Sequence, residues 1–181
     1  DLYGICTGLG PGSFTGLRIG LGSAKGLAAP SGLRFFGVPT LDSFALRCET
    51  DKLICSVIDA RKQELYAAFY RKSSAGNVER ISDFFAATPE KLAEQIVEPV
   101  HVVGEGLLIY KEAIRELLGE KASYGTTSDN TVSAAALGLI ADKTHEMDIS
   151  DSGPLYVRAS DAELNLQRKT ANDSEKKDKN S

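Results

Sequence analysis

The chain has 181 residues, of which 42% are hydrophobic and 25% charged, and its formal net charge is −4 at pH 7. This composition is typical of a globular protein with one large or two small domains, and the negative balance argues against nucleic-acid binding over the whole surface. No apolar run reaches the length of a membrane span and no signal-peptide pattern stands at the start, so we expect a cytoplasmic protein.

The cysteines and histidines do not predict a metal site. Cys6, Cys48 and Cys55 lack metal-ligand spacing and are odd in number, which favours buried free thiols in a reducing compartment. His101 stands in an apolar run and His145 near the end of an alanine-rich stretch, and neither has a second ligand at a useful distance along the chain.

The first 49 residues alternate between strand and helix. We expect a strand at 2–6, a helix at 14–29, a strand at 32–37 and a helix at 41–48. Ser13 is placed to cap the first long helix, and Pro30 is expected to end it. This alternation favours a parallel sheet with right-handed crossovers, and residues 1–49 are predicted to belong to an N-terminal α/β domain.

Residues 50–130 are predicted to form a second α/β domain. Its expected elements are three antiparallel strands at 53–58, 64–71 and 78–86, a helix from Pro89 capped by Thr88, a strand at 100–103 and a helix at 107–118. An alanine-rich helix at 131–147 is expected to return to the first domain. Residues 148–170 are predicted to be a C-terminal extended segment, and 171–181 a disordered tail.

The glycine-rich turn GLGPGSFTG follows the first strand and opens the first long helix. A strand, a glycine turn and a helix N-terminus together can hold a phosphate. However, no lysine follows Gly16 as a P-loop requires, and the glycines do not fit the dinucleotide fingerprint. A structural turn is therefore favoured over a phosphate site, whose candidate residues are Gly10, Gly12, Ser13 and Thr15.

The helix that begins at Phe14 has two apolar sides. One side carries Phe14, Leu17, Leu21, Ala24 and Ala28, and the other carries Gly16, Ile19, Gly20, Ser23 and Leu27. Interior glycines each cost about 0.8–1 kcal/mol of helix stability relative to alanine. Close backbone approach would offset that cost, so we expect the glycine side to pack on the sheet and the Leu17 side to be free for another helix.

No catalytic constellation is evident in the sequence. Ser13 is not in a nucleophile-elbow motif. Asp59, Arg61 and Glu64 are best interpreted as a charged hairpin corner. We therefore expect no catalytic residues and no metal ligands.

Four segments in order resemble the TsaB (YeaZ) family. They are GPGSFTGLRIGLGSAKGLA, GVPTLDSFA, ICSVIDARKQELYAAFY and PLYVR. The resemblance implies an α/β protein of the actin/Hsp70-like (ASKHA) nucleotidase fold, with two related α/β domains. It also implies that the first domain here lacks its opening strands and helix.

The family resemblance implies a non-catalytic scaffold for threonylcarbamoyladenosine modification of tRNA beside the anticodon. Its implied partners are the TsaD transferase, the TsaE ATPase and a second copy of itself, with tRNA contacted indirectly and no membrane. No intrinsic cofactor is implied, although ATP or ADP can bind in the complex. The histidines that hold the metal in TsaD have no counterpart at residues 37–44.

The helix that begins at Phe14 is predicted to carry the partner interface. Its predicted interface residues are Phe14, Leu17, Arg18, Leu21, Ala24, Lys25 and Ala28. The alternatives are an ATP-dependent kinase or glycoprotease-like enzyme of the same fold, and a plain nucleotide-binding module.

Overall fold

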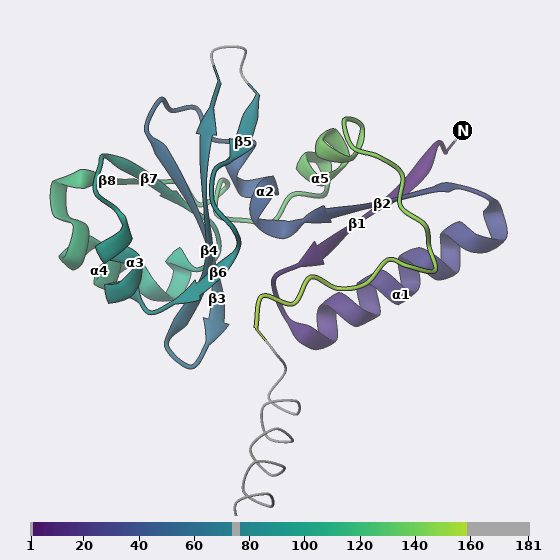
Figure 1. Cartoon of the computed structure of the whole chain (residues 1–181), viewed down its shortest axis with the longest axis horizontal. Helices are drawn as coiled ribbons and strands as arrows, with labels where there is room; N and C mark the ends of the chain where they lie inside the picture. The colour runs from purple at the N-terminus through teal and green to yellow at the C-terminus, as the bar shows by residue number, and fades with distance from the viewer. Residues whose placement is uncertain (1, 74–76, 159–181) are drawn as a thin grey trace, which may run out of the picture.

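The computed structural model describes residues 2–73 and 77–158, which form two lobes (Figure 1). Lobe 1 contains β1 (Gly4–Gly10), α1 (Phe14–Ser31), β2 (Arg34–Pro39) and α5 (Ala134–Ala141). The short helix α2 (Thr40–Ala45) lies between the lobes. The expected tail at 171–181, and residues 159–170 of the expected extended segment, lie outside the described residues.

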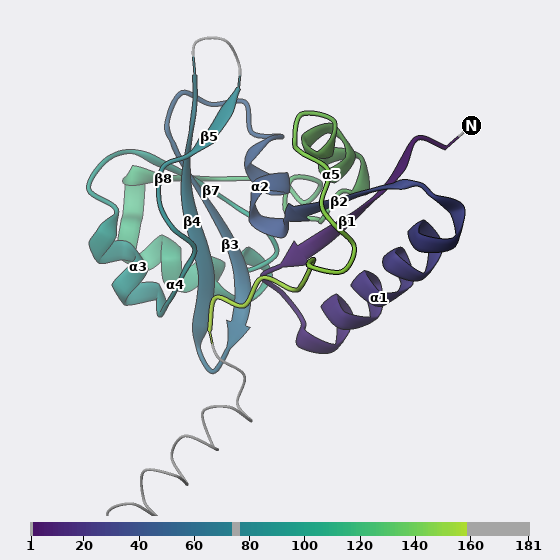
Figure 2. The same cartoon turned by 45° about the vertical axis from the view of Figure 1, so that its right-hand side comes forward.

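Lobe 1 is a three-layer unit built on a two-stranded parallel sheet of β1 and β2. Successive side chains of a strand point to opposite faces. Phe35 therefore joins the core beneath α1, whereas Phe36 joins the core beneath α5. The two helices accordingly lie on opposite faces of the sheet (Figure 2).

Lobe 2 is a six-stranded mixed sheet with two helices. Its strands are β3 (Leu53–Arg61), β4 (Glu64–Lys72), β5 (Val78–Arg80), β6 (Phe85–Ala87), β7 (Val100–Val103) and β8 (Ala122–Tyr124). Its helices are α3 (Pro89–Gln95) and α4 (Leu107–Leu118), and a 3₁₀ turn follows at Gly119–Lys121. The antiparallel pairing of β3 with β4 confirms the predicted hairpin, and β7 adds in parallel to the other side of β3.

Strand β3 is buried on both faces, which explains its nearly continuous apolar sequence. On one face Cys55 and Val57 share a core with residues of α3 and α4. On the other face Ile54 and Ile58 share a core with Leu41 and Phe44 of α2. Helix α2 is therefore packed into lobe 2 while its chain continues directly from β2 of lobe 1.

Most predicted elements have somewhat different bounds in the structure, and three differ for reasons that the contacts show. Helix α1 includes Pro30 and ends at Ser31, because the Ser31 hydroxyl bonds the carbonyl oxygen of Leu27 at 2.6 Å and Gly32 adopts a left-handed φ of 62°. The strand predicted at 78–86 is two short strands, β5 and β6, which both pair with β4. The helix predicted at 131–147 is shorter, and Ser133 caps its start.

None of the described helices is both long and apolar enough to cross a membrane.

Candidate functional site

The inner face of α1 is formed by the residues that were predicted to be free. Leu21, Ala24 and Ala28 are buried at 6%, 8% and 0% exposure, and they share a core with Phe35. The prediction that this face meets a partner is therefore wrong for these three residues. The two alanines are small enough to bring the helix close to the sheet, so glycine is not needed for that approach.

The glycine side of α1 faces outward, which reverses the predicted orientation of the helix. Ile19 and Leu27 are each 64% exposed on this side. A Cβ built on Gly20 or Gly26 would meet nothing within 4 Å, and one on Gly16 would meet only the Ser13 side chain. Packing within the described chain therefore does not require these glycines. We call this exposed side, with Gly16, Ile19, Gly20, Ser23, Gly26 and Leu27, the glycine face.

One flank of α1 is covered by residues 147–158, here called the strap. The ring of Phe14 stacks on Tyr156 at 5.5 Å between centroids. Arg18 Nε donates to the Tyr156 hydroxyl at 3.0 Å, and Lys25 Nζ donates to the Ser152 carbonyl oxygen at 2.5 Å. Three more of the predicted interface residues are thus engaged by the chain itself, although Phe14 stays 42% exposed.

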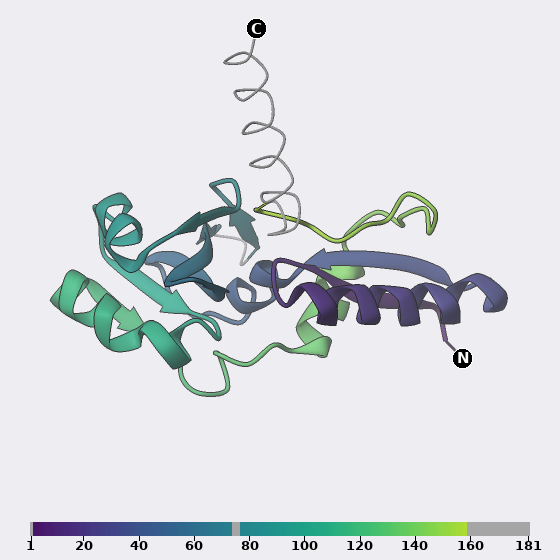
Figure 3. The ribbon, with the colours of Figure 1, turned by 90° about the horizontal axis from the view of Figure 1, so that it is seen from below.

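The strap runs beside α1 toward lobe 2 (Figures 1 and 3). It begins at Met147, whose backbone N–H bonds the Phe35 carbonyl oxygen at 2.9 Å. Met147 and Ile149 then pack against the core beneath α1. An extended segment was expected at 148–170, but these contacts were not, because their partners lie far away along the chain.

The glycine-rich turn forms one wall of a cleft between the lobes. The cleft has a volume of about 580 Å³, and its lining includes Gly12, Ser13, Thr15 and the half-buried Leu17. The predicted cap is confirmed, because Ser13 Oγ accepts from the Gly16 N–H at 3.3 Å. Of the four residues considered for phosphate binding, Gly10 is the one that does not line the cleft. It is buried behind this wall with a φ of 108°.

The opposite wall of the cleft is the tip of the β3–β4 hairpin. Arg61, Lys62 and Gln63 all have φ between 53° and 63°, in the left-handed region that side-chain-bearing residues seldom adopt. Asp59 supports this tip, because its Oδ1 accepts from the Arg61 backbone N–H at 2.8 Å. A strained backbone of this kind is often found at binding sites.

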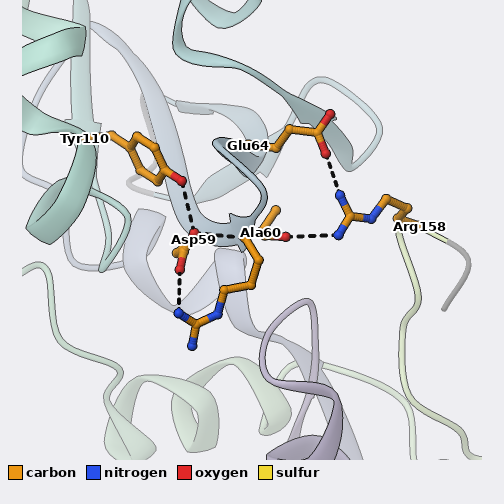
Figure 4. A network of polar contacts seen from close by, with 6 residues as sticks. Asp59, Ala60, Glu64, Tyr110 and Arg158 are labelled. Atoms are coloured by element: carbon orange, nitrogen blue, oxygen red, sulfur yellow. Dashed lines mark hydrogen bonds and ion pairs between the residues drawn. The ribbon is translucent and has the colours of Figure 1, made fainter. Parts of the chain in front are cut away.

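Asp59 connects the hairpin tip to α4. The Tyr110 hydroxyl donates to Asp59 Oδ1 at 3.2 Å, and the Arg61 guanidinium lies 3.3 Å from Asp59 Oδ2 (Figure 4). Burial, followed by the nearby Asp59 carboxylate, raises the pKa of Tyr110. The expected charged hairpin corner is therefore present, and it is tied to a helix that the sequence analysis did not connect with it.

The strap closes the cleft at its third side. The Arg158 guanidinium donates to Glu64 Oε2 at 2.5 Å and to the Ala60 carbonyl oxygen at 3.1 Å (Figure 4). The cleft therefore has cationic side chains from Arg61, Lys62 and Arg158 at its margin, together with the carboxylates of Asp59 and Glu105. Such a margin can bind a ligand that carries both anionic and donor groups.

The cysteine thiols and histidine imidazoles are not among the groups that line this cleft. Within residues 2–73 and 77–158, no group of three or more His, Cys, Asp or Glu side chains is gathered as metal ligands would be. Cys48 and Cys55 are buried free thiols, and Cys6 is half-buried. Burial raises the pKa of Cys48 to about 12.

Comparison with known proteins places the sequence among tRNA-modification proteins. The family described as tRNA N6-adenosine threonylcarbamoyltransferase (TsaD) matches residues 1–164. The tRNA threonylcarbamoyladenosine biosynthesis protein TsaB of Bacillus subtilis (strain 168) is 28% identical over 167 residues, which cover 90% of this chain and 72% of the relative. The protein of the same name in Escherichia coli (strain K12) is 42% identical over 79 residues, which cover 42% of this chain and 34% of the relative.

Two solved structures from Pseudomonas aeruginosa share the fold. One is described as an uncharacterized protein with similarity to peptidase YeaZ; it has a TM-score of 0.67 at 22% identity, covering 86% of this chain and 74% of its own. The other is described as YeaZ; it has a TM-score of 0.63 at 22% identity, covering 83% and 72%. The expected fold class, α/β of the actin/Hsp70-like nucleotidase type, is confirmed.

Proposed function

Because the chain belongs to the TsaB (YeaZ) family, within the wider TsaD family, we propose that it takes part in threonylcarbamoyladenosine biosynthesis in tRNA as a non-catalytic scaffold subunit. It would act in the cytoplasm, and its free thiols fit a reducing compartment. The family resemblance names a TsaD-type transferase as its main partner, with the TsaE ATPase joining and tRNA contacted through the complex.

The observation that carries this proposal is the glycine face of α1. A helix in solution gains nothing from interior glycines, each of which costs about 0.8–1 kcal/mol relative to alanine. Gly20 and Gly26 have no neighbour that a Cβ would touch, so no contact within the described chain offsets that cost. Ile19 and Leu27 lie on the same side and are largely exposed. A partner that approaches the backbone closely would offset the helix-propensity cost of the glycines and would also bury Ile19 and Leu27.

A helix is the partner that best fits this surface. Small residues four apart allow two helices to approach closely, and flanking apolar side chains then interdigitate. Gly16 and Gly20 have that spacing, and Ile19 and Leu27 flank them. We therefore propose that this face, in place of the Leu21 side, pairs with a helix of the TsaD-type subunit. Two copies of this chain would pair through the same face when that subunit is absent.

The experiment that tests this function is reconstitution of the modification. The chain is expressed in cells depleted of their own TsaB, and threonylcarbamoyladenosine in total tRNA is measured by mass spectrometry. We expect the modified nucleoside to return, and tagged chain to retain a TsaD-type protein. A stably folded chain that neither restores the nucleoside nor retains that protein contradicts the proposal.

A second candidate function is nucleotide binding in the interlobe cleft. The specific observation in its favour is that Gly12, Ser13 and Thr15 lie across a cleft of about 580 Å³ from Arg61 and Lys62. We propose that ATP or ADP, if held by this chain in the complex, occupies this cleft. Titration with ATP followed by calorimetry tests it, and assay of phosphate release in the same samples distinguishes binding from a kinase-like or hydrolytic activity.

A further inference from the structure

We propose that the strap is a latch between the lobes, and that Arg158 holds the interlobe cleft closed. The proposal concerns the conformation of this chain and does not depend on the partner proposed above.

The strap is anchored to lobe 1 along most of its length. Met147 and Ile149 pack into the core beneath α1. The Ser152 carbonyl oxygen accepts a hydrogen bond from Lys25 Nζ, and the Leu155 N–H donates to the Leu9 carbonyl oxygen at 2.7 Å. Tyr156 contacts α1 through its ring and its hydroxyl. These contacts fix the strap up to Tyr156, so it moves with lobe 1.

Arg158 ties the strap to lobe 2. Within residues 147–158, the hydrogen bonds to lobe 2 come from Arg158, which contacts Glu64 Oε2 and the Ala60 carbonyl oxygen. The ion pair is partly shielded from water, because the two side chains are 25% and 32% exposed. Partial burial weakens the screening of such a pair by salt but does not abolish it.

The lobes are also joined at α2 and through residues 125–133, which connect β8 to α5 and whose Ser128 and Asp129 carbonyl oxygens accept from the Arg47 guanidinium at 2.8 and 2.7 Å. Leu41 and Phe44 are fully buried in the core of lobe 2, and the Tyr70 hydroxyl donates to Asp42 Oδ1 at 2.7 Å. Strap residues 155–158 line the cleft, whereas α2 is absent from its lining. Loss of the Arg158 contacts would therefore leave α2 and residues 125–133 as the hinge and let the cleft widen.

The test measures the distance between the lobes in solution. Spin labels are placed at Gly22→Cys on α1 and Glu116→Cys on α4, both exposed, in a Cys6→Ser background of the full chain. Pulsed electron double resonance then compares the chain with Arg158→Ala, Arg158→Lys and the charge swap Arg158→Glu with Glu64→Arg. We expect Arg158→Ala to broaden the distribution toward longer distances, Arg158→Lys to do so less, and the swap to restore it in part.

The matched control is Arg34→Ala, which removes an ion pair with Glu146 that lies outside lobe 2. We expect the distances in this control to match those of the parent chain. Raising the salt concentration should broaden the parent distribution and leave that of Arg158→Ala unchanged. The latch proposal is wrong if the parent chain and Arg158→Ala give identical distance distributions. It is also wrong if Arg34→Ala broadens the distribution as much as Arg158→Ala does.

Discussion

Ile19 and Leu27 lie eight residues apart on the same outward side of α1, and each exposes 64% of its surface. Between them the helix carries Gly20, Ser23 and Gly26, which are small and exposed. Leu21, Ala24 and Ala28 attach the helix to the sheet from the other side. A change on the outward side can therefore alter pairing without disturbing the core of lobe 1.

Charged substitution of Ile19 and Leu27 is expected to abolish pairing. Full burial of a leucine or isoleucine side chain is worth about 1.5–3 kcal/mol, and an unpaired carboxylate in the same place adds a desolvation cost. We therefore expect Ile19→Glu with Leu27→Glu to weaken binding to a TsaD-type subunit by about 100-fold or more. Titration by calorimetry or interferometry measures this. Leu108→Glu on α4 is the control, since Leu108 is 76% exposed but lies on lobe 2, and equal losses in both variants would contradict the assignment.

Gly20→Ala is expected to raise the stability of the isolated chain and to weaken its binding to the partner. In the isolated chain the new methyl group meets nothing, so the free energy of unfolding should rise by about 0.8–1 kcal/mol from helix propensity alone. In the complex the same methyl group would stand between two closely packed helices and weaken binding. Chemical denaturation and a binding titration measure the two effects.

Gly22→Ala is the matched variant for that experiment. Gly22 is exposed with open space around it, but it lies about 200° around the helix from Gly20. We expect a similar gain in stability with unchanged binding. If Gly20→Ala binds the partner as tightly as Gly22→Ala does, the glycine face is not a close helix contact.

Gly104→Ala is expected to destabilise lobe 2 severely. Gly104 has a φ of +119°, and a Cβ at this position would lie 2.2 Å from the Val57 carbonyl oxygen. Relieving that overlap requires movement of the central strand, so we expect a loss of about 3 kcal/mol or more. Gly119→Ala is the control, because its φ is +53° but its Cβ would meet nothing, and it should lose only about 1 kcal/mol. Urea denaturation distinguishes the two.

The cysteines are expected to react in a fixed order. Burial raises the pKa of Cys48 to about 12 and also raises that of Cys55, so neither forms appreciable thiolate near neutral pH. Cys6 is half-buried, and its pKa is raised less. Alkylation with iodoacetamide at pH 8 followed by mass spectrometry should modify Cys6 first. Modification of Cys55 before Cys6 in the folded chain would contradict this burial.

Protonation of His101 is expected to destabilise the chain as pH falls. Burial lowers the pKa of His101 below its usual 6.5, so the unfolded chain binds the proton at a higher pH than the folded chain does. Stability is therefore fully retained above the unfolded pKa and is lost as pH falls below it toward the folded pKa. His101→Gln retains a side chain that can bond Ser123 Oγ, which lies 3.1 Å from His101 Nδ1.

The measurement for His101 is the difference in unfolding free energy between the parent chain and His101→Gln from pH 7.5 to 5. Other groups that titrate in this range contribute equally to both chains and cancel. We expect the parent to lose more stability than the variant as pH falls. Parallel curves would show that His101 has the same pKa in both states.

The sequence predicted the order of the elements better than it predicted the faces of α1. Ser13 and Thr88 cap the helices that follow them as expected, because capping depends on a few local atoms. The orientation of α1 could not be derived in the same way, since both of its sides are apolar. The alanines at 24 and 28 were the available signal, because alanine permits close packing on a sheet without the cost of glycine.

The cleft could be predicted only in part. The glycine turn and the Asp59 corner were each recognised, but their opposition across a cleft depends on tertiary structure. The role of Arg158 was hidden for a related reason. Its partners Glu64 and Ala60 are more than ninety residues away along the chain, and an exposed arginine near other charges is usually just solvated.

The connectivity of the lobes has a consequence for synthesis. The strands of lobe 2 within the described residues lie between Leu53 and Tyr124, whereas lobe 1 needs both its early strands and the later α5 and strap. Domains form as units while the chain emerges from the ribosome. Lobe 2 can therefore complete its sheet while β1, α1 and β2 still wait for the residues that cover them. During that interval Phe36, which α5 covers in the folded chain, is unprotected, and binding by a chaperone is expected to be strongest there.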